Sequence, residues 1–288
     1  MPRGDHLMNP LHQELDCALR LAEAAGSLIL EKRSVALANV TQKSNNQGPV
    51  TEADLAADAL ISEGLRHAFP DDVLITEETW ATDDDLPQAS RVWCVDPLDG
   101  TSDFSKGGPD YVVMIGLCID GCPALGVVYH PVSETFWTGV TDVNGGKSAE
   151  KIHSGQRTPL QVRPFDAERA AVLVSRSHPS RAIDQMLNEL GVQERITRGS
   201  VGLKGGAIAH GEADLYVTAT NHIKVWDTCA PQAILQAAGG QLTGLLGAPL
   251  SYTGKASHPV GVCAASNDAH AHFQPLIQKL WDRRHPAG

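Results

Sequence analysis

The chain has 288 residues, of which 42% are hydrophobic and 20% are charged, values typical of a globular protein with one large domain or two ordinary ones. Lys and Arg number 23 against 34 for Asp and Glu, which gives a formal net charge of −11. Because nucleic acids and anionic membranes are themselves negative, this charge argues against both as partners. A phosphorylated substrate would need local cations to overcome the general repulsion.

The cysteines and the apolar runs indicate in which cellular compartment the protein is expected. The six cysteines form no Cys-x-x-Cys pair and most lie within apolar stretches, so we expect buried free thiols rather than disulfides or zinc ligands. Residues 1–30 lack the continuous apolar stretch of a signal peptide, and no window reaches the length of a transmembrane helix. We therefore expect a protein of the reducing cytoplasm.

The first half of the chain predicts two helices followed by an antiparallel sheet. Apolar residues recur with a helical period over 11–29 and again over 51–68, where Ala68 belongs to the buried face. Asp120-Gly121 between two apolar runs predicts a β-hairpin, and the Gly- and Ser-containing stretch 144–156 predicts a surface loop. The predicted strands are 73–75, 91–95, 111–119, 124–130 and 135–140.

From about residue 165 the pattern changes to an alternation of strands and helices, which is typical of an α/β fold. We expect an α+β N-terminal domain over residues 1–165 and an α/β C-terminal domain over residues 166–288. The predicted elements of the second half are strands 171–175, 215–218 and 260–265 and helices 180–190, 203–210, 227–238 and 268–281.

The run 96–101 (Asp-Pro-Leu-Asp-Gly-Thr) carries the strongest functional signal. Its proline fixes one backbone dihedral angle and its glycine permits a left-handed conformation, so Asp96 and Asp99 can face a common centre. The amides of Gly100 and Thr101 can then turn outward. Converging carboxylates suit a cation and exposed amides suit an anion, which indicates phosphate chemistry with metal ions. The alternative is an ordinary loop, because Asp-Pro and Asp-Gly are common turn dipeptides.

Three further acidic segments are candidates for the same site. Glu77 and Glu78 follow a predicted strand, Asp227 begins an apolar helix, and Asp54 lies in the first turn of another. Each also has a structural interpretation: a solvated acidic pair, a helix N-cap, and a capping-box partner of Thr51, respectively.

Taken together, these segments resemble the signature of the lithium-sensitive, magnesium-dependent phosphatases of the inositol monophosphatase superfamily. The resemblance extends over nearly the whole chain, from Pro49-Val50-Thr51-Glu52-Ala53-Asp54 to Trp226-Asp227. It implies a layered α/β/α/β/α arrangement of the inositol monophosphatase and fructose-1,6-bisphosphatase type, with the active site between the two halves.

The resemblance also implies the metal ligands. Glu77, Asp96 and the carbonyl of Leu98 would hold one Mg²⁺, and Asp96, Asp99 and Asp227 a second, while a third and weaker ion would involve Glu77 and water. Such a set of oxygen ligands favours Mg²⁺ over zinc. We therefore expect two to three Mg²⁺ ions.

The same resemblance assigns the catalytic residues. Asp54 and Thr101 would hold and activate the nucleophilic water, and Glu77 completes the expected catalytic set. The amides of Gly100 and Thr101 would receive the phosphate at a helix start. Two cations about 3.5–4 Å apart can clamp a phosphate ester for in-line attack by water.

The substrate depends on other positions. The inositol enzymes carry a glutamate seven residues before the last motif aspartate, and Thr220 stands there in this chain. Residues 175–178 (Ser-Arg-Ser-His) instead resemble the Ser-rich segment of the 3′(2′),5′-bisphosphate nucleotidases, and Lys204 falls where that branch places a lysine. The expected substrate-binding residues are therefore Ser177, His178 and Lys204, together with Gly100 and Thr101.

The chain also departs from the nucleotidase pattern. Ser102, Thr218 and Val201 stand where that branch often has Lys, Arg and Ser, respectively. Since a second phosphate needs a cationic contact beyond the metals, Lys224 or Arg198 could contribute one.

The resulting prediction is a Mg²⁺-dependent phosphomonoesterase of sulfur metabolism that acts on adenosine 3′,5′-bisphosphate, with the 5′-sulfated form as a further substrate. The enzyme alternatives are an inositol monophosphatase, a histidinol-phosphatase or a sugar-bisphosphate phosphatase. The non-enzyme alternative is a metal-dependent sensor of a bisphosphate nucleotide. The expected partner is a small phosphorylated molecule, and the expected oligomeric state is a monomer or a homodimer.

Overall fold

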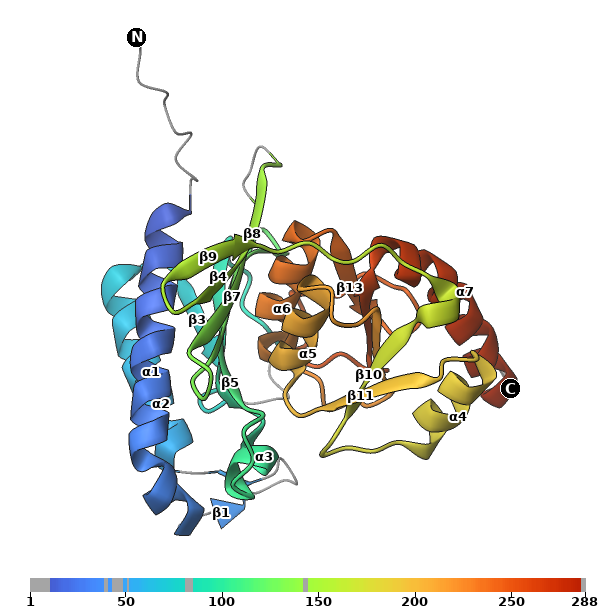
Figure 1. Ribbon diagram of the computed structural model, residues 1–288. Helices are drawn as coiled ribbons and strands as arrows, with labels where there is room; N and C mark the ends of the chain where they lie inside the picture. Colours follow the sequence, from blue (N-terminus) through green and yellow to red (C-terminus); the bar gives the residue numbers. More distant parts are fainter. Residues whose placement is uncertain are drawn as a thin grey trace.

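The computed structural model describes residues 11–38, 41–42, 49–50, 52–80, 85–141 and 145–285. Figure 1 shows five layers: an outer pair of helices, a β-sheet, a middle pair of helices, a second β-sheet and another outer pair of helices. The predicted α/β/α/β/α fold is confirmed.

The first layer consists of α1 (His12–Ala38) and α2 (Glu52–Ala68), which pack on one face of the first sheet. Both predicted helices are confirmed, although Thr51 lies outside the described residues. The prediction that Ala68 is buried is wrong. The helix ends at this residue, and its last turn lies beyond the buried Leu65.

The first sheet has seven strands in chain order, and all neighbours are antiparallel except the first pair. A separate two-stranded pair precedes it, formed by β1 (Thr41–Gln42) and β2 (Pro49–Val50). The strands of the large sheet are β3 (Val73–Thr76), β4 (Arg91–Asp99), β5 (Val112–Ile119), β6 (Cys122–His130), β7 (Thr135–Thr141), β8 (Lys147–His153) and β9 (Gln156–Pro159).

The hairpin between β5 and β6 was predictable from the sequence, but the polar strands β8 and β9 at the end of this sheet were not. Asp120 and Gly121 have φ angles of 48° and 78°, as the predicted two-residue hairpin between β5 and β6 requires. The loop predicted over 144–156 is wrong, since β8 and β9 form there. Among their residues only Ala149 is buried, so these two strands at the end of the sheet carry no apolar alternation that would reveal them.

The second sheet has the order β11-β10-β12-β14-β13 and mixes parallel and antiparallel pairs. Strands β11 and β13 were not predicted, because the first is mostly exposed and the second directly follows a helix stop at Gly239. Its strands are β10 (Ala171–Ser175), β11 (Glu194–Arg198), β12 (Leu215–Thr218), β13 (Gly240–Gly244) and β14 (Val262–Ser266).

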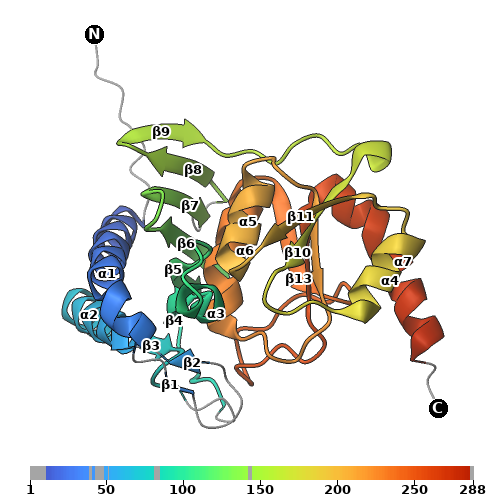
Figure 2. The ribbon, with the colours of Figure 1, turned by 60° about the horizontal axis from the view of Figure 1, so that its bottom comes forward.

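Four longer helices flank the second sheet. Figures 1 and 2 place α5 (Val201–Ala209) and α6 (Val225–Ala237) between the two sheets, and α4 (Arg181–Glu189) and α7 (Asn267–Arg284) on the outer side. All four were predicted to within a few residues. One hydrophobic core contains residues of both sheets, such as Met114 and Leu173, together with residues of α6, such as Ile234. The division into domains 1–165 and 166–288 therefore stays a prediction.

Three glycines let α6 lie directly on the first sheet. Gly116, Gly126 and Gly139 are register neighbours on β5, β6 and β7. A Cβ atom at Gly126 would lie 2.2 Å from the Ala230 carbonyl oxygen, and one at Gly139 would lie 2.4 Å from the Cα of Ile234. The backbone of α6 therefore packs against a row without side chains, and this contact sets the position of the residues at its first turn.

The cysteines follow the prediction in most respects. All six are free thiols, and five are buried while Cys122 is exposed. None of the helices among the described residues is long and apolar enough to cross a membrane.

Candidate active site

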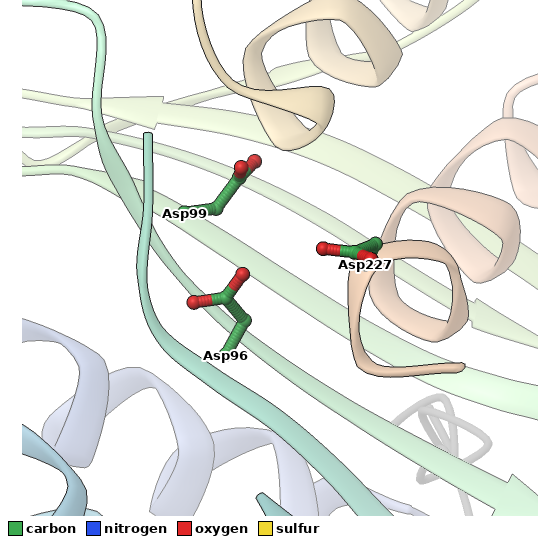
Figure 3. Close-up of side chains that lie close together, drawn as sticks. All are labelled: Asp96, Asp99 and Asp227. Atoms are coloured by element: carbon green, nitrogen blue, oxygen red, sulfur yellow. The ribbon is translucent and has the colours of Figure 1, made fainter. Parts of the chain in front are cut away.

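Three carboxylates converge at the junction of the first sheet and α6. One oxygen from each of Asp96, Asp99 and Asp227 lies within 4.8 Å of the others. Figure 3 shows the first two side chains rising from β4 and the third approaching from the first turn of α6. The structure therefore brings these three predicted site residues together.

A bulge in β4 explains how two aspartates three residues apart face the same centre. Side chains alternate along a regular strand, so residues three apart point to opposite faces. Here Asp96 pairs with Met114 and Asp99 with Val112, so β4 spans three residues where β5 spans two. The extra residue changes the alternation and brings both carboxylates to one side. The Leu98 amide also donates to Asp96 Oδ1 at 3.0 Å.

Asp227 is oriented by the start of its own helix. Lys224 is the N-cap residue, and its backbone amide donates to Asp227 Oδ2 at 2.6 Å. Asp227 is therefore the third helical residue in a capping box rather than the N-cap itself. This bond uses one carboxylate oxygen and leaves the residue directed at the other two aspartates.

Glu77 and Asp54 add their charges to this cluster. Burial raises the pKa of Asp96 well above its ordinary value, and the negative charges of Glu77, Asp99, Asp227 and Asp54 raise it further. Burial also raises the pKa of Asp227, with Asp99 and Glu77 as the next causes. Five predicted acidic residues thus share one electrostatic site, and a divalent cation would relieve their repulsion.

The chain reverses immediately after the aspartates. Gly100 has a φ of 101°, and a Cβ atom there would lie 2.5 Å from the Asp110 carbonyl oxygen, so only glycine fits. The short helix α3 (Thr101–Ser105) begins at the next residue. The first amides of a helix have no acceptor within it, so those near Gly100 and Thr101 can bind an anion.

The segment after β10 lies across from α3. Arg176 Nη1 lies 2.8 Å from Asp103 Oδ1 and 2.9 Å from Asp110 Oδ2, and Ser177 Oγ donates to Asp103 Oδ2 at 3.0 Å. Partial burial lowers the pKa of His178, and the charges of Lys204 and His222 lower it further. The charge of Asp99 acts in the opposite direction and raises the pKa of His178, which links this histidine to the carboxylate cluster. Ser177, in contrast, is used in a contact within the protein.

Lys204 is not on the surface. Its side chain is only 2% exposed, and Nζ donates to the carbonyls of Gly199 and Ser200. Burial lowers the pKa of this ammonium group to about 8. The other two cations considered from the sequence also have protein partners, since Lys224 Nζ donates to Ser257 Oγ at 2.6 Å and Arg198 lies 3.9 Å from Glu212.

Sequence reasoning missed Ser200, Asp103 and Asp110. A serine before the helical pattern of α5 is an N-cap signal and could have been found. Its contact with Asp99, 101 positions earlier, carries no sequence signal.

Comparisons with known proteins relate nearly the whole chain to one family of phosphatases. The sequence profile of the inositol monophosphatase family matches residues 11–285. The 3′(2′),5′-bisphosphate nucleotidase CysQ of Escherichia coli (strain K12) is 37% identical over 244 residues, which cover 84% of this chain and 95% of that protein. The Golgi-resident adenosine 3′,5′-bisphosphate 3′-phosphatase of Homo sapiens is 33% identical over 225 residues, 75% of this chain and 57% of that protein. The structure of inositol monophosphatase from Anabaena (Nostoc) has a TM-score of 0.73 at 27% identity, covering 93% of this chain and 96% of its own. The chain therefore belongs to the inositol monophosphatase family.

Proposed function

We propose that this chain is a Mg²⁺-dependent phosphomonoesterase that removes the 3′-phosphate of adenosine 3′,5′-bisphosphate. The observation that supports the chemistry is the convergence of Asp96, Asp99 and Asp227 within 4.8 Å. The substrate is suggested by the two relatives above, which are named for bisphosphate nucleotides. Thr220, in place of the glutamate of the inositol enzymes, is consistent with this choice.

Two to three Mg²⁺ ions would be held by the acidic cluster. Glu77, Asp96 and the Leu98 carbonyl form one proposed ligand set, and Asp96, Asp99 and Asp227 form the other. When bound, Mg²⁺ would offset the charge of the phosphate ester and acidify a water molecule. The crowding of buried negative charge that raises the pKa values of Asp96 and Asp227 would also favour a divalent cation, with which protons compete.

The remaining residues would act on the water and the phosphate. Asp54, fully buried on α2, and Thr101, at the first position of α3, would orient the nucleophilic water, and the Asp54 carboxylate would accept its proton. The amides of Gly100 and Thr101 would hold the phosphate oxygens. His178 is our candidate for the second phosphate, and direct substrate contacts by Ser177 and Lys204 stay predictions.

A phosphate-release panel with Mg²⁺ tests the proposed activity. It compares adenosine 3′,5′-bisphosphate, inositol 1-phosphate, histidinol phosphate and fructose 1,6-bisphosphate at equal concentration. We expect the highest kcat/KM for the bisphosphate nucleotide, because it offers His178 a second phosphate that inositol 1-phosphate and histidinol phosphate lack. Fructose 1,6-bisphosphate also has two phosphates, so it tests whether the nucleoside is required. A preference for inositol 1-phosphate would contradict the proposed substrate. If no phosphate ester is turned over, the result would favour the non-enzyme alternative, a metal-dependent sensor of a bisphosphate nucleotide.

The variant Asp54→Asn tests the proposed water activation. We expect kcat to fall by about 10²- to 10⁴-fold, since a positioned general base contributes that much. Asp71→Asn removes an exposed carboxylate on the turn before β3 and serves as the matched control. Unchanged phosphate release by Asp54→Asn would exclude the catalytic role.

Other expectations also stay predictions. They are a cytoplasmic location, inhibition by lithium, and a monomeric or homodimeric state.

A further inference from the structure

One oxygen of Asp99 is held by the start of α5. Asp99 Oδ2 accepts a hydrogen bond from Ser200 Oγ at 2.5 Å and another from the Gly202 amide at 2.9 Å. Both donors lie about a hundred positions later in the chain, on the helix between the two sheets. Two donors on one oxygen restrict the rotation of the carboxylate and leave the second oxygen for a ligand.

Ser200 is held in an uncommon backbone conformation. Its φ is 21° and its ψ is 135°, outside the regions that residues other than glycine ordinarily adopt. Its hydroxyl also accepts from the Leu203 amide at 3.1 Å as the N-cap of α5. A residue with a strained backbone, whose hydroxyl both donates and accepts a hydrogen bond, keeps this conformation only where its surroundings hold it in place.

Lys204 supplies that support. Its ammonium group donates to the carbonyls of Gly199 and Ser200, the two residues that lead into the helix, and lies 4.8 Å from the centre of the Tyr216 ring. A buried ammonium group is costly unless it is hydrogen-bonded, and here its acceptors are backbone atoms of the strained turn.

The other side of the same turn is fixed by Asp110. Its Oδ2 accepts from the Gly199 amide at 2.8 Å and lies 2.9 Å from Arg176 Nη1. A Cβ atom at Gly199 would lie 2.6 Å from Asp110 Cβ and 2.7 Å from Asp103 Oδ2, so no other residue fits without displacing these groups. The turn before α5 is thus clamped from both sides.

We propose that Ser200 is a positioning residue that orients Asp99 for metal binding, and that Lys204 acts through Ser200 by holding its backbone. This inference rests on the proposed Mg²⁺ site. It assigns Lys204 a role different from the substrate contact expected from the sequence.

The experiment measures Mn²⁺ binding to the substrate-free protein by electron paramagnetic resonance, with Mn²⁺ as the probe for Mg²⁺. We expect Ser200→Ala to raise the Kd for Mn²⁺ by about 10- to 100-fold, which is the usual effect of losing a group that orients a metal ligand. Ser200→Gly relieves the backbone strain but also lacks the hydroxyl, so it should show the same loss.

Ser266→Ala is the matched control. Ser266 is also a buried N-cap, and its Oγ accepts from the Ala269 amide at 3.3 Å without contacting the acidic cluster. The Ser266→Ala variant should have a lower thermal stability and an unchanged Kd for Mn²⁺. Wild-type affinity in Ser200→Ala and Ser200→Gly would overturn the inference, even if both variants melted earlier.

Lys204→Met separates the two roles of the lysine. A positioning role predicts weaker Mn²⁺ binding in the absence of substrate. A substrate contact predicts an unchanged Kd for Mn²⁺ with a raised KM for the bisphosphate, and that result would overturn the role of Lys204. If the wild type binds no Mn²⁺, or if Asp99→Asn binds it normally, the proposed metal site itself fails and this inference fails with it.

Discussion

Individual side chains in this protein are placed where burial changes their protonation. Asp96 is 1% exposed, and burial together with four neighbouring carboxylates raises its pKa. His258 is 4% exposed and shares a hydrogen bond of 2.9 Å with Thr228 Oγ1, next to Asp227 in the chain. Burial lowers the pKa of His258 to about 4, and Lys224 contributes to this shift. The carboxylates therefore favour a bound cation, whereas His258 is held neutral beside Thr228.

His258 predicts a loss of stability in acid. Its pKa in the folded protein, about 4, is below the ordinary 6.5, so the unfolded chain binds a proton that the folded protein rejects. The contribution of neutral His258 to the free energy of unfolding is complete above pH 6.5. It is lost as the pH falls toward 4, which lowers that free energy by about 2–3 kcal/mol. Urea unfolding with chelator at pH 7 and pH 4.5 should show a smaller loss in His258→Gln than in the wild type. The exposed His67→Gln should match the wild type, and equal losses in all three proteins would contradict the assignment.

At the level of elements, the β4 bulge and the contact of α6 with the sheet bring the acidic residues together. The bulge turns Asp96 and Asp99 to the same side, and the glycine row of β5, β6 and β7 lets α6 approach with Asp227 in its first turn. Both determine the distances on which metal binding depends.

The glycine row predicts that a single methyl group disturbs the site. In Gly126→Ala the new Cβ would meet the Ala230 carbonyl oxygen at 2.2 Å, so α6 must shift. We expect a loss of about 1–3 kcal/mol in unfolding free energy, which is typical of overpacking, and weaker Mn²⁺ binding as Asp227 moves with the helix. Gly244→Ala is the control, because its nearest contact would be an ordinary 3.4 Å. A Gly126→Ala protein as stable as this control would show that α6 does not depend on the row.

Across the whole molecule, the site joins elements that are distant in the chain. Asp96 and Asp99 belong to the first sheet, and Asp227 belongs to a helix between the two sheets. The contacts of Arg176 with Asp103 and Asp110 make a second link between the segment after β10 and α3. A ligand that binds the three aspartates therefore stabilises the packing of the molecule as well as the local site.

Mg²⁺ should therefore raise the thermal unfolding midpoint of the metal-free protein. At a concentration of 100 times Kd the stabilisation amounts to about 2.7 kcal/mol. The raised carboxyl pKa values mean that protons compete with the cation, so the effect of Mg²⁺ should be larger at pH 8 than at pH 6. Differential scanning calorimetry measures both effects. Asp227→Asn should reduce them, and a midpoint that does not respond to Mg²⁺ at either pH would argue against the metal site.

Much of the fold was predictable because its signals are local. The periodicity of α1 and α2, the Asp120-Gly121 hairpin and the acidic signature at 96–101 all depend on neighbouring residues. The errors occurred where local signals are absent. Strands β8 and β9 are polar strands at one end of the sheet, with β9 at its edge, and they are held by ladder hydrogen bonds. They carry no buried alternating face from which they could be predicted.

The sequence by itself determined the residue types of the site: the carboxylates at 54, 77, 96, 99 and 227 and the glycine turn at 100, whose chemistry suits a divalent cation and a phosphate. Only the tertiary structure decided how these groups are oriented. A lysine that the sequence places among substrate contacts is buried beneath Ser200, and that serine holds Asp99 across a hundred positions of chain. The physical reason is that burial and hydrogen-bond geometry arise from packing between distant elements, which local patterns do not encode.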